Sequence, residues 1–174
     1  YLNLGFCALR LGDVEKAIGY YQKSRLRNPA SLLISRGLAE CHFVKEEYSR
    51  AAQLCSNIVE RAVETEDVVF GFSFRGFLLE TKFKKLKLAK QHYSRALEYQ
   101  IQRPMILLRL TSLSIQEKDW TEAKESLDKG LSLSDKSPKI EEMYQLASAA
   151  LEKQDLLSKE YQLLNETLRE WDFY

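Results

Sequence analysis

A chain of 174 residues is long enough for one domain or for a short array of repeated units. Hydrophobic residues make up 45% of it and charged residues 29%, with only 7 Gly and 3 Pro, so the composition favours helices over a turn-rich β protein. The 26 basic residues nearly balance the 25 acidic ones, which excludes a global attraction for nucleic acid or for an anionic membrane.

The first 29 residues predict two helices joined by a tight turn. Apolar residues recur every three to four positions before Gly12, and again from Val14 to Leu26. Gly12 can end the first helix in a left-handed conformation, Asp13 can cap the second helix, and Pro29 stops it. This stretch therefore predicts a helical hairpin.

The same hairpin recurs along the chain. Its second helix carries Ala17 and, four residues later, Tyr21; the equivalent alanines are Ala51, Ala89 and Ala123, in steps of 34, 38 and 34 residues. We expect small residues at these positions because neighbouring helices must approach closely there. The spacing predicts four repeats over residues 1–31, 32–65, 70–103 and 104–137, followed by a pair of capping helices over 139–174.

This pattern resembles the tetratricopeptide repeat family, whose signature is W-x2-L-G-x2-Y followed by A-x3-F and a proline. The first repeat matches it best, at Tyr1, Leu4, Gly5, Ala8, Ala17, Tyr21 and Pro29. The resemblance implies an all-α fold, a right-handed α-α superhelix of about four hairpins with a C-terminal cap, forming a single solenoid domain over residues 1–174. Because the chain opens inside the first helix of a repeat, we expect a fragment of a larger protein.

In that family the first helix of each hairpin lines a groove that holds extended or helical peptides. The resemblance therefore implies partner-binding residues at the equivalent positions here, which are Leu2, Phe6, Arg36, Glu40, Phe43, Phe74, Arg75, Leu78, Leu108 and Arg109. Gly37 and Ser112 stand at further positions that the resemblance places along the groove. Packing on neighbouring helices is the alternative for the apolar members, whereas we expect the arginines to be exposed because Arg rarely repeats in a buried core.

The groove positions also indicate the kind of partner. Relatives that hold the C-terminal carboxylate of chaperones use a set of Lys, Asn and Arg residues, of which only Arg75 is matched here. An apolar or amphipathic segment with acidic groups for Arg36, Arg75 and Arg109 fits better. In the cap, we expect Leu157, Tyr161, Leu164, Leu168 and Trp171 to face the fourth repeat.

No pattern in the sequence indicates catalysis. His42 and His92 are not placed beside a nucleophile, and no glycine-rich phosphate loop or paired carboxylates in an apolar setting occur. No Cys or His pair has metal-binding spacing. We therefore expect no enzyme, no cofactor and no metal. Cys7, Cys41 and Cys55 lie among apolar helical residues, which predicts buried free thiols in a reducing compartment, and hence a cytoplasmic location.

The densest run of charge is KFKKLKLAK, a basic patch of Lys82, Lys84, Lys85, Lys87 and Lys90. It is either a solvated loop or a contact for phosphate or an acidic partner. The run lacks interleaved exposed aromatic residues, which argues against nucleic acid, and no apolar run reaches the roughly 20 residues of a membrane span.

These observations lead to one hypothesis and two alternatives. The first is a non-catalytic scaffold that binds a partner protein or peptide in the groove. The alternatives are a structural module that self-associates by stacking through its N-terminal end, and third, an RNA-binding helical solenoid.

Overall fold

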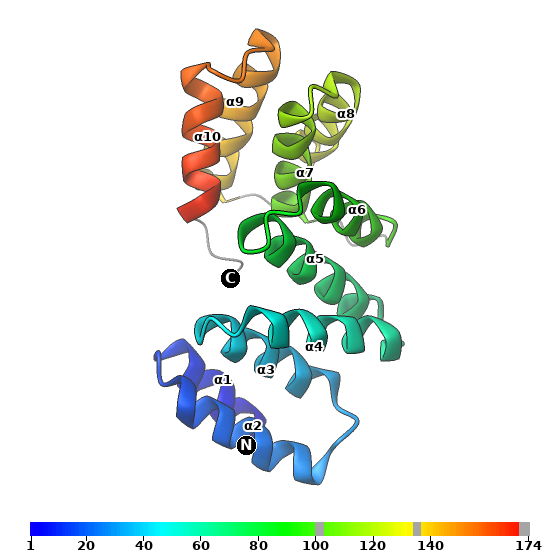
Figure 1. Ribbon diagram of the computed structural model, residues 1–174, viewed down its shortest axis with the longest axis vertical. Helices are drawn as coiled ribbons and strands as arrows, with labels where there is room; N and C mark the ends of the chain where they lie inside the picture. Colours follow the sequence, from blue (N-terminus) through cyan, green and yellow to red (C-terminus); the bar gives the residue numbers. More distant parts are fainter. Residues whose placement is uncertain (100–102, 134–136, 171–174) are drawn as a thin grey trace. The chain divides into compact units, whose positions relative to one another are not determined.

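The computed structural model describes residues 1–99, 103–133 and 137–170, and these ranges contain helices and no strand (Figure 1). The predicted all-α class is confirmed. The helices are α1 Leu2–Arg10, α2 Val14–Arg27, α3 Leu32–Val44, α4 Tyr48–Arg61, α5 Thr65–Thr81, α6 Leu86–Leu97, α7 Pro104–Gln116, α8 Trp120–Leu131, α9 Pro138–Lys153 and α10 Lys159–Glu170. They fall into two compact units, Tyr1–Lys85 and Leu86–Tyr174, called unit 1 and unit 2 below.

In unit 1 the helices form two rows. Each helix packs against the next one in sequence, and α3 also contacts both α1 and α5. Helices α1, α3 and α5 are therefore neighbours in one row, with α2 and α4 in the other. Side chains from the first row can share a single face of the unit.

The first turn has the predicted local geometry. Gly12 has a φ of +81°, a conformation that costs glycine little, and the Asp13 side chain accepts a hydrogen bond from the Lys16 backbone N–H at 3.3 Å. A difference appears at α5, which begins at Thr65 and not near residue 70. Glu66 and Asp67 lie in its first turn, where acidic groups interact favourably with the helix dipole, so residues 66–69, which fell between the second and third predicted repeats, belong to the helix.

Small residues allow the close helix contacts, as the repeat pattern predicted. Ala17, Ala51, Ala89 and Ala123 are fully buried. Tyr21 of α2 lies between two glycines of the other row: a Cβ on Gly5 would be 2.7 Å from its ring, and one on Gly37 would be closer still. Gly37 therefore contacts Tyr21 inside the unit, and the prediction that it lines the groove is wrong.

Unit 2 repeats this arrangement of glycine and tyrosine. A Cβ on Gly130 of α8 would collide with the ring of Tyr144 on α9, whose hydroxyl donates a hydrogen bond to the Pro104 carbonyl at 2.6 Å. Helix α7 packs against α6, α8, α9 and α10. Its side chains from Ile106 to Ile115 are buried all round.

The C-terminal helix pair is present, with one shift from the prediction. Tyr161, Leu164 and Leu168 are buried, as expected for residues that face the preceding helices. Leu157 is 83% exposed, because it precedes α10 in a turn, so its predicted packing is wrong. Trp171 lies outside the described residues. In the described ranges, no helix has the length and apolar character needed to cross a membrane.

Candidate functional site

Side chains from α1, α3 and α5 form a continuous strip on unit 1. The guanidinium of Arg10 lies 5.9 Å from the centre of the Phe6 ring, and the charge of Arg10 also acts on Glu40 of α3. Arg36, on the same helix as Glu40, lies 4.5 Å over the Phe70 ring of α5. We define the unit 1 strip as Phe6, Arg10, Arg36, Glu40, Asp67 and Phe70, of which Phe70 is buried beneath Arg36.

Phe6 provides the exposed apolar part of this strip. Its side chain is 54% exposed, although it lies in a helix whose opposite side is packed. Leu2, one turn earlier, is partly buried against the core of the unit. Of these two predicted groove residues, Phe6 is therefore the one with a large surface available to a partner.

Glu40 is a half-buried carboxylate without a hydrogen-bond donor. It makes no hydrogen bond or ion pair with any of the residues that the structure describes, because the nearest guanidinium on its own helix, that of Arg36, bonds to Asp67 at 3.3 Å. Burial raises the pKa of Glu40 above its ordinary value of 4.5, and Arg36 and Arg10 offset this only in part. Glu40 is thus a partly buried hydrogen-bond acceptor that no donor among the described residues occupies.

Glu40→Gln is expected to raise the melting temperature at neutral pH. Burial raises the pKa of Glu40 in the folded chain, so ionisation costs more there than in the unfolded chain. Below pH 4.5 the carboxyl is neutral in both states, and the cost appears as the pH rises through the folded pKa. Thermal unfolding of both proteins across this range measures the effect. A difference in melting temperature between the two proteins that is the same at every pH would contradict this prediction.

The other aromatic groove residues of unit 1 mostly pack against each other. The Phe43 ring lies 5.7 Å from that of Phe74 and 5.5 Å from that of Phe77, as aromatic pairs in a core do. Phe74 and Leu78 are fully buried, while Phe43 is half-buried. For Phe74 and Leu78 the structure therefore favours the packing alternative.

The predicted arginines bind within the chain. Arg36 pairs with Asp67, and Arg75 donates a hydrogen bond to Ser56 Oγ of α4. Arg109 is only 3% exposed and donates to the Leu168 carbonyl at 3.0 Å, so its predicted exposure is wrong. Leu108 beside it is buried as well. The reason lies in α10, which covers this part of α7.

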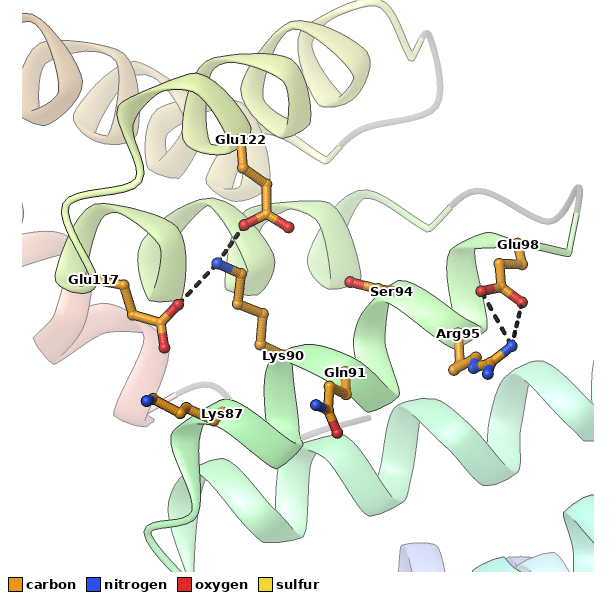
Figure 2. Close-up of a pocket in the computed structure, with 8 residues that line it drawn as sticks. All are labelled: Lys87, Lys90, Gln91, Ser94, Arg95, Glu98, Glu117 and Glu122. Atoms are coloured by element: carbon orange, nitrogen blue, oxygen red, sulfur yellow. Dashed lines mark hydrogen bonds and ion pairs between the residues drawn. The ribbon is translucent and has the colours of Figure 1, made fainter.

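Unit 2 has a polar hollow of about 780 Å³ over α6, α7 and α8 (Figure 2). Lys90 lies at its centre, with Nζ 2.8 Å from Glu117 and also paired with Glu122. Ser114 donates to the second of these carboxylates at 2.9 Å. Burial lowers the pKa of Lys90, but the two hydrogen-bonded carboxylates outweigh it, so the pKa lies above its ordinary value.

The hollow is better explained as an ion-pair network that joins α6 to the start of α8 than as a ligand site. Its remaining charges include Arg95 and Glu98, which pair with each other at 3.1 Å. The lining residues carry three positive and three negative charges in total, which cancel. Such a surface offers a charged ligand no net attraction.

Two of the five lysines of the basic patch make contacts within the chain. Lys82 lies over the rings of Phe43 and Tyr48, at 5.3 and 4.9 Å, as a cation–π contact. Lys90 is held in the hollow of unit 2. Only Lys84, Lys85 and Lys87 are exposed lysines without such a contact. The local excess of positive charge is therefore smaller than the sequence suggested.

Histidine and cysteine side chains show structural contacts. His42 Nδ1 lies 2.7 Å from Glu47 across the α3–α4 turn. Cys41 and Cys55 are buried free thiols, as predicted, and burial raises the pKa of each to about 12. Cys7 is exposed, so its predicted burial is wrong: the side of α1 that carries it faces solvent. Among the described residues, no group of three His, Cys, Asp or Glu side chains could hold a metal ion.

Comparison with known proteins adds no family assignment. The chain matches no protein-family model and no curated protein sequence.

Proposed function

We propose that the chain is a segment of a tetratricopeptide-type helical array and serves as a non-catalytic scaffold. A segment of a partner protein binds along the unit 1 strip, across α1, α3 and α5. The observation that carries this proposal is that Arg10 links two unused groups: it lies over the exposed Phe6 ring, and its charge acts on Glu40 of the neighbouring helix, a carboxylate without a hydrogen bond to the described residues. An apolar anchor beside a polar group that fixes orientation is the usual chemistry of a peptide site.

The contacts refine the chemistry expected of the partner. The sequence suggested acidic partner groups for three arginines, but Arg36, Arg75 and Arg109 already bind within the chain. The group that the strip lacks is a donor for Glu40, so the partner supplies an N–H next to a large apolar side chain. An extended peptide has backbone N–H groups available for this role.

Selection from a displayed random-peptide library tests this proposal. We expect the wild-type chain to enrich peptides that bind Phe6→Ala and Glu40→Leu at least about tenfold more weakly, since the first change removes the aromatic ring and the second removes the hydrogen-bond acceptor. Leu26→Ala is the matched control, because Leu26 is 87% exposed on α2, in the other row of helices. Binding that both strip variants retain, or that Leu26→Ala abolishes, would place the site elsewhere.

A further inference from the structure

Helix α10 lies on the α7 positions for which the sequence predicted a groove. Arg109 donates to the Leu168 carbonyl at 3.0 Å, and Ser112 Oγ donates to Asn165 Oδ1 at 2.8 Å. Leu108 belongs to the same apolar cluster as Leu164 and Leu168. On α1 and α3 of unit 1 the slots equivalent to Leu108 and Ser112 hold exposed or half-buried side chains, namely Leu2, Phe6, Arg36 and Glu40, whereas in unit 2 a helix of the same chain covers them.

The α10 surface that makes these contacts has the pattern of a groove-binding helix. Tyr161, Leu164 and Leu168 are buried at spacings of three and four residues, and Asn165 lies between them. Leu163, on another side of the helix, is 48% exposed. The helix has 12 residues, a length that is marginal for an isolated helix in water, so its order depends on what it packs against.

The α7 surface beneath it contains polar groups that water can also satisfy. Arg109 and Ser112 bond to a backbone carbonyl and to an amide, and neither group needs α10 once solvent reaches it. A contact of this mixed kind is typical of non-obligate interfaces, whereas permanent ones are more apolar. The turn at Gln154, with a φ of 48°, and residues 155–158 connect α10 to α9.

We propose that α7 and α9 form a helix-binding groove that α10 occupies in the same chain, and that a partner's amphipathic helix binds there by displacing α10. The partner helix carries large apolar residues at positions i, i+3 and i+7 and an amide side chain at i+4, as α10 does with Tyr161, Leu164, Leu168 and Asn165. This site is separate from the unit 1 strip and does not depend on the function proposed for it.

A labelled synthetic peptide of residues 156–170 serves as the probe, with fluorescence anisotropy as the readout on the full chain. The chain with Leu164→Ala and Leu168→Ala has a weakened internal α10, so we expect it to bind the peptide at least about tenfold more tightly than wild type does. The control is a peptide with serine in place of Leu164 and Leu168, which is expected not to bind. A folded double variant that fails to bind the probe, or binds the control peptide equally, overturns the proposal.

Two further measurements locate the site. Replacing the asparagine of the peptide by alanine is expected to weaken binding about 2- to 10-fold, and this loss disappears when the chain carries Ser112→Ala. Phe6→Ala in the chain is expected to leave peptide binding unchanged. If Phe6→Ala abolishes binding, the peptide occupies the unit 1 strip and the α7–α9 groove is rejected.

Hydrogen exchange on the wild-type chain tests displacement without any substitution. We expect the amides of α10 to exchange faster than those of α9, because α10 opens while the rest of unit 2 stays folded. Exchange of both helices at one common rate would mean that α10 leaves only on unfolding of the unit, and would overturn the proposal even if the double variant does not fold.

Discussion

Gly37→Ala is expected to lower the stability of unit 1 by about 2–3 kcal/mol. The new methyl group would overlap the Tyr21 ring, which is 2% exposed. The Tyr21 ring cannot rotate away from the new methyl group, because its other side is packed against Gly5, where an added Cβ would lie 2.7 Å from the ring. The strain must therefore move α3 relative to α2, and denaturant unfolding measures its cost.

Gly19→Ala is the matched control for this substitution. Gly19 is also a helical glycine of unit 1, but no atom lies within 4 Å of the place where its Cβ would be. The same chemical change is expected to stabilise the chain there by about 0.5–1 kcal/mol, because alanine loses less conformational entropy in a helix. Equal effects at Gly37 and Gly19 would contradict the close contact with Tyr21.

Lys90→Met is expected to destabilise unit 2 by about 1–2 kcal/mol. The Lys90 side chain is 15% exposed, and its Nζ also lies 3.9 Å from Asp119 Oδ2. Removal of the Lys90 charge leaves Glu117, Glu122 and Asp119 close to one another without a cation. Because the folded pKa of Lys90 is raised above 10.5, its contribution is fully present below 10.5 and is lost only as the pH rises through the folded pKa. Thermal unfolding at neutral pH measures the loss.

Lys87→Met is the control for this effect. Lys87 lies on the same helix and lines the same hollow, but its side chain is exposed and no ion pair holds it (Figure 2). We expect its loss to change stability by less than about 0.5 kcal/mol. Adding Glu122→Gln to the Lys90→Met chain is expected to recover part of the stability, since it removes one of the repelling carboxylates. A double variant no more stable than Lys90→Met would argue against the ion-pair network.

Local sequence signals predicted much of the fold. Gly12 and Asp13 identified the first turn, and the spacing of Ala17, Ala51, Ala89 and Ala123 identified residues that are now seen to be buried. These features depend on backbone conformation and helix periodicity, which a short stretch of sequence carries. Phe6 and Glu40 were likewise among the predicted groove residues.

The burial of Arg109 could not be predicted from its own repeat, because it results from the return of α10, about 60 residues later, onto α7. A signal was nevertheless present. The run MILLRLTSLSI in α7 has apolar or small residues on every side, and a helix of that composition is covered all round. The contacts of Arg36 and Arg75 depend on Asp67 and Ser56 of neighbouring helices, which repeat spacing does not reveal.

The different environments of the three cysteines make the chain easy to label at one place. Cys41 and Cys55 are buried, and their pKa values of about 12 leave almost no thiolate at neutral pH, whereas Cys7 faces solvent. A maleimide dye therefore attaches to α1 alone, one residue after Phe6, without any engineered cysteine. Wild-type protein thus carries its own attachment point for a fluorophore next to the surface on which a partner is expected to bind.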